Sequence, residues 1–162
     1  MALSMLMEAS SWLSSRGISQ WPMEWIVSPV MRSWLTECAN RGELYLAGEE
    51  GARMGVFTLV NRQEGTDSFC WGQDSGECAY LHSFAVRRAW AGRGLGRRML
   101  SWAEEASVSA GKKLLRLDCS KDNPRLRRWY EEAGYALRGE CLPNNTGGRV
   151  LALYEKDLAK RP

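Results

Sequence analysis

The sequence predicts a mixed α/β fold in a single domain. Its middle part alternates strand-like and helix-like segments, and the order strand, helix, strand, helix, strand favours a sheet with at least one parallel pair of strands. The chain has 162 residues, of which 44% are hydrophobic and 25% are charged, as is typical of one soluble domain with one core. We therefore expect one domain over residues 1–162.

No segment of the sequence indicates export or insertion into a membrane. The chain has no run of about 18 apolar residues. Its apolar start also lacks the basic flank and the cleavage site of a signal peptide. We expect a cytoplasmic protein that does not bind a membrane.

The periodicity of apolar residues predicts ten elements, in the order helix, helix, strand, strand, strand, helix, strand, helix, strand, strand. They cover residues 1–15, 29–40, 43–48, 53–60, 78–86, 95–110, 113–119, 124–133, 135–141 and 149–158.

The first half is expected to form two helices and a hairpin. Apolar residues recur every three to four positions over residues 1–15, and Gly17 ends that helix. Ser28 followed by Pro29 is typical of a helix start, because Ser caps free N–H groups and Pro fits the first turn. The next two strand-rich runs flank a Glu-Glu-Gly turn, which predicts an antiparallel hairpin. Residues 61–77 are expected to be a polar loop that Phe69 to Trp71 interrupt.

The second half is expected to alternate helices and strands. Inward-facing apolar residues over 95–110 predict a helix that Gly111 ends. Pro124 begins the last helix and Gly134 ends it. The final two strands flank a turn at residues 143–148.

The cysteines and the single histidine argue against a metal site. No two of the five cysteines have the C-x-x-C spacing of a zinc or redox site, so we expect reduced and mostly structural thiols. His82 is the only histidine, whereas the common zinc enzymes use several histidines or cysteines. We expect no bound metal.

The charge is distributed unevenly along the chain. The net charge is +3, but residues 1–80 carry −5 and residues 81–162 carry +8. This pattern fits an anionic ligand held by the second half and a cationic one held by the first, or a solvated surface. The low total charge and the lack of a nucleic-acid-binding motif disfavour DNA or RNA as a partner.

The segment with the clearest chemistry is the run Ala91-Gly92-Arg93-Gly94-Leu95-Gly96, between a predicted strand and a predicted helix. Glycine lets main-chain N–H groups face a ligand, and the helix start adds the positive end of its dipole, so the run predicts a phosphate site. A tight strand-to-helix turn is the alternative interpretation. A Rossmann fingerprint would need a small residue where Arg97 stands, and the P-loop sequence Gly-Lys-Ser/Thr does not occur.

Two blocks of this sequence resemble the GNAT superfamily of N-acetyltransferases. The strand 80–86, the loop 91–96 and the helix that follows are similar to the acetyl-CoA-binding motif of the family. In the second block Asn123 opens a helix that carries the pair Trp129 and Tyr130, as in the next family motif. Two blocks in the correct order are far more specific than the glycines alone.

The resemblance, which runs over about residues 43–157, also implies a fold. It implies a mixed, mostly antiparallel twisted sheet flanked by four helices. The central parallel strands, 78–86 and 113–119, would be splayed around acetyl-CoA. The family usually opens with a β-strand, and this chain lacks one before its first helix.

The resemblance further implies how acetyl-CoA would bind as the co-substrate. Its pyrophosphate would lie on the N–H groups of the loop, and its pantetheine arm would pair like a strand with residues 84–86. The family usually has Arg or Gln where Ala91 stands, so Arg88 or Arg93 would supply charge instead. The expected cofactor-binding residues are Phe84, Ala85, Val86, Arg88, Ala91, Gly92, Arg93, Gly94, Leu95, Gly96, Arg97 and Asn123.

Two residues are expected to be catalytic. Tyr130 matches the general acid of the family, and a phenol with a pKa of about 10 can protonate a thiolate with a pKa of about 8.5. His82 is the candidate base for an ammonium substrate, with a structural role as the alternative, and Glu77 and Asp118 are further candidates. Asn123 matches the position that steadies the cofactor or an ordered water, or it caps its helix.

We therefore expect an N-acetyltransferase that moves the acetyl group of acetyl-CoA to a primary amine of a small molecule or peptide. The acidic residues and tryptophans of the first half fit a cationic acceptor. The alternative is a non-catalytic acyl-CoA-binding sensor or partner module. An exposed edge of the sheet would allow a homodimer.

Overall fold

The computed structural model describes residues 1–49, 51–144 and 146–159. In these residues six strands form one sheet in the order β1-β2-β3-β4-β6-β5. β3 and β4 are the parallel pair, and the sheet is otherwise mostly antiparallel. The expected fold class, a mostly antiparallel mixed sheet with a parallel centre, is therefore confirmed.

All ten expected elements occur, and their bounds differ from the expected ones by no more than two residues. The strands are β1 (Leu44–Glu49), β2 (Ala52–Val60), β3 (Cys78–Val86), β4 (Leu114–Ser120), β5 (Ala136–Cys141) and β6 (Leu151–Asp157). The helices are α1 (Ala2–Ser14), α2 (Met23–Ile26), α3 (Pro29–Asn40), α4 (Thr66–Trp71), α5 (Leu95–Ser109), α6 (Pro124–Glu131) and the 3-10 turn η1 (Arg88–Trp90). None of the described helices is long and apolar enough to cross a bilayer.

Two short helices were not expected, so the described residues contain six α-helices and not four. α2 has four residues and α4 has six. Such short segments complete one or two turns, which is too little for a helical period to show in the sequence. The expectation of a polar loop over 61–77 is wrong over α4, which includes the expected interruption of that loop at Phe69 to Trp71. The expected turns at 49–51 and 143–148 include residues 50 and 145, which lie outside the described residues.

The chain divides into two compact units. The first comprises Met1–Leu59 and Leu81–Trp102, and the second comprises Val60–Tyr80 and Ala103–Pro162. β3 and α5 therefore each contribute residues to both units.

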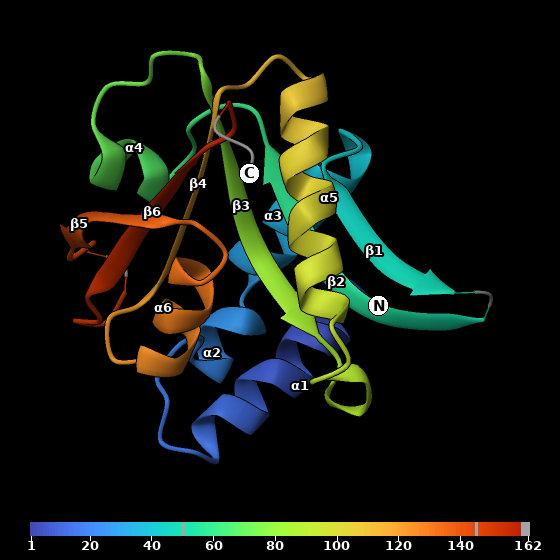
Figure 1. Cartoon of the computed structure of the whole chain (residues 1–162). Helices are drawn as coiled ribbons and strands as arrows, with labels where there is room; N and C mark the ends of the chain where they lie inside the picture. The colour runs from blue at the N-terminus through green and yellow to red at the C-terminus, as the bar shows by residue number, and fades with distance from the viewer. Residues whose placement is uncertain (50, 145, 160–162) are drawn as a thin grey trace. The chain divides into compact units, whose positions relative to one another are not determined.

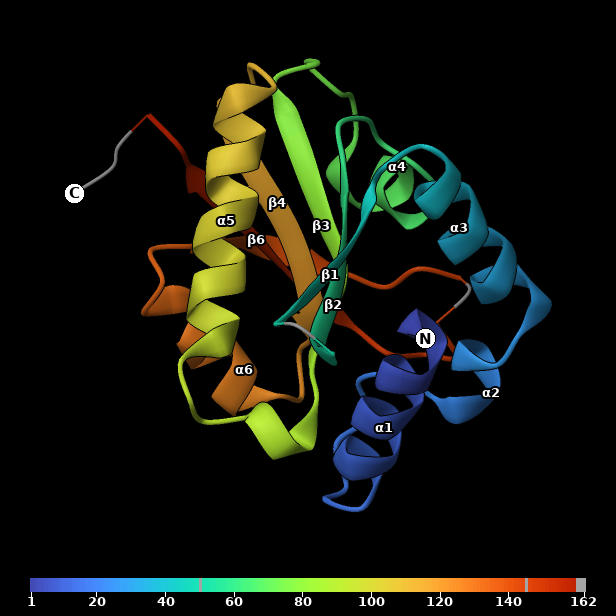
Figure 2. The same ribbon diagram turned by 90° about the vertical axis from the view of Figure 1, so that its right-hand side faces the viewer.

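The first unit begins with three helices that pack together, as Figure 2 shows for α1, α2 and α3. Leu6, Ile26 and Met31, one from each helix, are buried in their shared core. The side chain of Ser28 caps α3 by accepting a hydrogen bond from the N–H of Met31 at 3.2 Å, as its sequence position predicts. Residues 1–43, all of which the structure describes, contain no strand, in agreement with the expected absence of an opening strand.

The hairpin of β1 and β2 supports the start of α5. Tyr45 and Phe57 lie opposite each other in the hairpin, and their rings stack with centroids 5.2 Å apart. Gly55 lies so close to α5 that a Cβ there would be 2.5 Å from the sulfur of Met99. A glycine at this position lets the helix approach the strand closely.

The second unit is built on β4, β6 and β5, with β6 between the other two (Figure 1). The buried carboxylate of Glu155 on β6 accepts hydrogen bonds from Arg116 at 2.8 Å and from Arg138 at 2.9 Å. Two cationic partners offset the cost of burying this carboxylate.

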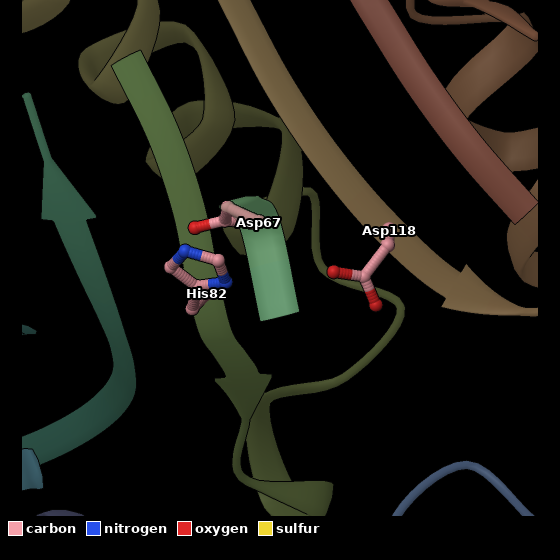
Figure 3. A group of neighbouring side chains, drawn as sticks. All are labelled: Asp67, His82 and Asp118. Atoms are coloured by element: carbon pink, nitrogen blue, oxygen red, sulfur yellow. The ribbon is translucent and has the colours of Figure 1, made fainter. Parts of the chain in front are cut away.

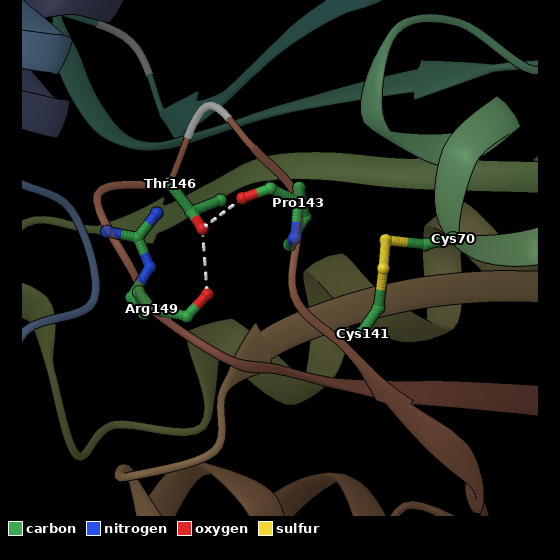
Figure 4. Close-up of a disulfide and its surroundings, with 5 residues drawn as sticks. All are labelled: Cys70, Cys141, Pro143, Thr146 and Arg149. Atoms are coloured by element: carbon green, nitrogen blue, oxygen red, sulfur yellow. Dashed lines mark hydrogen bonds between the residues drawn. A yellow bond between two sulfur atoms is a disulfide. The ribbon is translucent and has the colours of Figure 1, made fainter.

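One expectation about the cysteines is wrong. Cys70 on α4 and Cys141 on β5 form a disulfide, with their Cα atoms 5.6 Å apart (Figure 4). The two residues are 71 positions apart, so only the fold brings them within bonding distance, and no spacing rule could indicate the pair. Cys38, Cys78 and Cys119 are free and buried, as expected for structural thiols.

Candidate active site

The glycine-rich loop lies in the first unit, between η1 and the N-terminus of α5. Gly92 and Gly94 both have φ of +77°, a conformation that residues with a side chain rarely adopt. The carbonyl of Gly94 accepts the first bond of α5, from the N–H of Arg98 at 3.2 Å. The N–H groups of Leu95 and Gly96 belong to the first turn of α5, which has no preceding turn to bond to, so the loop presents donors at the positive end of a helix dipole. This arrangement can hold a phosphate or pyrophosphate.

A carboxylate of α1 holds the segment just before the loop. Glu8 accepts a hydrogen bond from the N–H of Arg88 at 2.6 Å and another from the guanidinium of Arg87 at 2.7 Å. The same Arg87 donates to the carbonyl of Arg53 on β2 at 3.0 Å. Sequence reasoning missed this role of Glu8, because a single acidic residue on an amphipathic helix carries no signal of a distant partner.

The arginines around the loop are placed by aromatic rings. The guanidinium carbon of Arg88 lies 3.7 Å from the centroid of the Trp12 ring. The guanidinium carbon of Arg93 lies 5.2 Å from the Trp90 ring. Cation–π contacts of this kind orient a charge without neutralising it, so both residues keep a positive charge beside the loop. Ala91, which stands between them, is half-buried, as is Arg97 in the first turn of α5.

β3 changes conformation just before the loop. Ser83 has φ of +53°, which is unusual for a residue other than glycine and breaks the regular strand conformation. The side chains of a regular strand point alternately to its two faces, and this alternation is interrupted at Ser83, between His82 and Phe84. Phe84 packs against Phe57 with ring centroids 6.0 Å apart, Ala85 is buried, and Val86 is half-buried.

The candidate bases belong to different units. His82 is half-buried in the first unit, and its ring lies edge-on to Trp34 with centroids 5.8 Å apart. Asp67 on α4 and Asp118 on β4 belong to the second unit, where one carboxylate oxygen of each lies within 4.8 Å of the other. Figure 3 shows the three side chains on their elements. Asp67, one of the acidic residues of the first half that fit a cationic acceptor, is almost fully buried.

Tyr130 lies on the buried face of α6 in the second unit, among other aromatic rings. Its ring is 5.9 Å from that of Tyr135 and 6.1 Å from that of Tyr154. The hydroxyls of Tyr135 and Tyr154 donate to Glu104 and Glu131, and the hydroxyl of Tyr80 donates to Asp74. The side chain of Tyr130 is itself almost fully buried.

The surroundings of Tyr130 keep its proton in place. Burial raises the pKa of Tyr130 above its usual value, and the neighbouring Cys119 and Asp118 raise it further. The phenol therefore stays protonated at neutral pH and can donate its proton. Asn123 caps the same helix, because its Oδ1 accepts a hydrogen bond from the N–H of Leu126 at 3.2 Å.

Comparisons with known proteins agree with this fold. The profile of the Acetyltransferase (GNAT) family matches residues 6–135. The chain is 31% identical over 140 residues to YesJ of Bacillus subtilis, an uncharacterized N-acetyltransferase, covering 83% of this chain and 74% of YesJ. It is 24% identical over 117 residues to the 5-NmdU N-acetyltransferase of Pseudomonas phage PaMx11, covering 72% of this chain and 71% of that protein.

A solved structure leads to the same conclusion. The crystal structure of a GNAT-family acetyltransferase from Listeria monocytogenes has a TM-score of 0.73 and 26% sequence identity, and the match covers 94% of this chain and 85% of that one. The family profile covers well over half of the chain. This protein therefore belongs to the GNAT acetyltransferase family and is an acyltransferase that uses acetyl-CoA as its co-substrate.

Proposed function

We propose that this enzyme transfers the acetyl group of acetyl-CoA to a primary amine of a small molecule or peptide. The observation that carries the proposal is Tyr130, whose side chain is almost fully buried on α6 and whose raised pKa keeps its phenol protonated at neutral pH. A phenol that holds its proton can donate it to a departing thiolate, as a general acid does. The two relatives named above are both N-acetyltransferases, which supports an amine as the acceptor.

The first unit supplies the residues for acetyl-CoA. The N–H groups of residues 92–96 bind the pyrophosphate, and Arg88, Arg93 and Arg97 supply positive charge beside it. Ala91 contributes only its main chain. Residues 84–86 pair with the pantetheine arm. The break in the strand conformation at Ser83 supports this pairing, because it takes the main-chain groups beside it out of the regular strand geometry. Asn123 steadies the cofactor, and it caps α6 at the same time.

The chemical step needs a base for the amine and an acid for the departing sulfur. Acetyl-CoA supplies an acetyl group on a thioester. His82 takes a proton from the ammonium group, and the free amine then forms a C–N bond with the carbonyl carbon as the C–S bond breaks. Tyr130 gives its proton to the sulfur, so that free CoA leaves as a thiol. The nitrogen of the new amide loses its second proton to the Tyr130 phenolate, which restores the acid. Asp118 and Glu77 are the alternative bases.

The family match begins at residue 6 and supports a single acetyltransferase domain over the whole chain. We also propose a cytoplasmic location. The three free cysteines support it, because thiols stay reduced in the cytoplasm, whereas the disulfide is more typical of an oxidising compartment. β1 and β5 are the edge strands of the sheet, and either could pair with a second copy of the chain.

An acceptor screen tests the proposed function. Purified protein is mixed with acetyl-CoA and a broad panel of amines, and release of the CoA thiol is measured. We expect turnover with at least one amine and its loss in Tyr130→Phe. Tight binding of acetyl-CoA without turnover of any amine would instead favour the non-catalytic acyl-CoA-binding module.

A further inference from the structure

Arg149 is a half-buried residue of the second unit, and part of its guanidinium group is shielded from solvent. It lies just before β6, at the end of the turn that follows β5. Its Nε and Nη1 atoms are buried, and neither has a hydrogen-bond acceptor in the described part of the chain. Proteins rarely bury a cationic donor without acceptors, because the group loses its water and gains nothing in exchange. This side chain is therefore a candidate for a ligand site.

The turn that carries Arg149 is firmly held. The hydroxyl of Thr146 lies 2.8 Å from the carbonyl of Pro143 and 2.8 Å from that of Arg149, and it bridges the two ends of the turn (Figure 4). The disulfide of Cys141 to Cys70 fixes the chain two residues before Pro143. Arg149 is thus positioned by the fold, and its burial is a built feature of the unit.

The charges near Arg149 are acidic but leave it without a direct partner. Asp118 is the neighbouring charge, and it raises the pKa of Arg149 by less than burial lowers it. No ion pair joins Arg149 to a carboxylate in the residues described. Asp118 in turn lies close to Asp67. The second unit therefore places the guanidinium of Arg149, which has no ion pair among the described residues, near the carboxylate of Asp118, and Asp118 near that of Asp67.

We propose that Arg149 binds an anionic group of the acceptor, so that the amine to be acetylated belongs to a molecule that also carries a carboxylate or a phosphate. A guanidinium is planar and can make two parallel hydrogen bonds to either group. The two aspartates complement the ammonium group of the same molecule. An amino acid has this combination of charges. The inference rests on the proposed function, and it narrows the substrate class.

The test uses pairs of amines that differ only in the anionic group. Amino acids and amines bearing a phosphate are compared with their uncharged carboxamide or hydroxyl counterparts, in the wild type, in Arg149→Met and in Arg149→Lys. The matched control is Lys121→Met, which removes an exposed cation of the same unit that pairs with Glu140. Thiol release gives kcat/KM for each amine, and calorimetry gives the affinity for acetyl-CoA.

We expect the wild type and Lys121→Met to prefer the anionic member of a pair by about 10-fold to 100-fold, the scale of a charge-assisted hydrogen bond. Arg149→Met should remove this preference, and Arg149→Lys should restore part of it. The carboxylate and phosphate arms show which anion is taken. Equal kcat/KM values for both members in the wild type, or an unchanged preference in Arg149→Met, would overturn the inference. So would a tenfold loss of acetyl-CoA affinity in Arg149→Met, because it would assign the arginine to CoA.

Thermal unfolding keeps this test separate from that of the proposed function. The anionic amines, without acetyl-CoA, should raise the Tm of the wild type and leave that of Arg149→Met unchanged. If no amine is turned over, the proposed function fails while this shift still decides on the anion site. If no anionic amine raises the Tm of the wild type more than that of Arg149→Met, the anion site is wrong.

Discussion

Glu8 on α1 and Arg87 after β3 form an ion pair of 2.7 Å, although 79 residues separate them in the sequence. The other oxygen of the same carboxylate accepts the N–H of Arg88 at 2.6 Å. Trp12, one turn further along α1, lies under the guanidinium of Arg88. The first helix therefore supports the segment that leads into the phosphate-binding loop.

Removal of this support should weaken the binding of acetyl-CoA. Glu8→Ala frees both Arg87 and the N–H of Arg88, and we expect about a tenfold higher Kd for acetyl-CoA together with a stability loss of about 1–3 kcal/mol. Calorimetry and urea unfolding measure the two effects. Glu37→Ala is the control, because Glu37 makes exposed contacts with Ser33 and Arg41, both within one turn of it along the chain. An unchanged Kd in folded Glu8→Ala would contradict this role.

A substitution in the loop should abolish the binding of acetyl-CoA. Gly94→Glu forces a side chain into a φ of +77° and places a negative charge where the phosphates bind. Gly111→Glu is a matched control, since Gly111 has the same φ of +77° and a Cβ there also has no neighbour within 4 Å. Both variants bear the same strain and charge. If calorimetry shows equal acetyl-CoA binding by the two variants, the loop is not the phosphate site.

The sequence was sufficient to predict what depends on neighbours along the chain. Ser28 caps α3 by a bond to a residue three positions later, and the strand, loop and helix around Gly94 lie next to one another in the sequence. Contacts made by folding were not predictable in this way. Glu8 with Arg88 and Cys70 with Cys141 are separated by 80 and 71 residues, and neither pair has a spacing that indicates its partner.

Arg149 was also beyond prediction. An arginine after a Gly-Gly turn is typical of an exposed loop, and only the folded chain shows that its donors are buried. α4, which carries Asp67 and Cys70, lies in a segment whose polar composition is typical of a loop. Local sequence patterns thus indicated the phosphate loop, whereas the second unit gains its candidate site through long-range contacts.

Reduction of the disulfide should destabilise the protein. The Cys70–Cys141 bond closes a loop of 71 residues, for which chain entropy predicts a stabilisation of about 4 kcal/mol. The Tm of the wild type should therefore fall when dithiothreitol is added, and that of Cys70→Ser/Cys141→Ser should not change further. A Tm of the wild type that does not respond to the reductant would show that the bond contributes little stability.

Tyr130→Phe should separate catalysis from folding. The variant keeps the aromatic ring and its packing against Tyr135 and Tyr154, so the free energy of unfolding in urea and the Kd for acetyl-CoA should remain close to those of the wild type. Its kcat should fall by about 100-fold or more, because the departing sulfur loses its proton donor. Tyr135→Phe provides the contrast, since it loses the bond to Glu104 and should lose about 1 kcal/mol of stability. A wild-type kcat in Tyr130→Phe would exclude the tyrosine as the acid.

The dependence of the rate on pH should distinguish the two roles considered for His82. If His82 is the base, its removal leaves only the fraction of acceptor that is already a free amine, and that fraction rises about tenfold per pH unit below the pKa of the amine. Both His82→Ala and His82→Phe should then lose most activity at pH 6 and recover as the pH approaches 9. Because the pKa of Tyr130 is raised by burial, the acid stays protonated over this range and does not distort the profile.

The alternative is that His82 serves only to pack against Trp34, whose ring lies 5.8 Å from the His82 ring. His82→Phe keeps an aromatic ring at this position, so it should then preserve the wild-type profile. Initial rates from pH 6 to 9 with one amine decide between the two, and a wild-type profile in His82→Phe would transfer the role of base to Asp118 or Glu77.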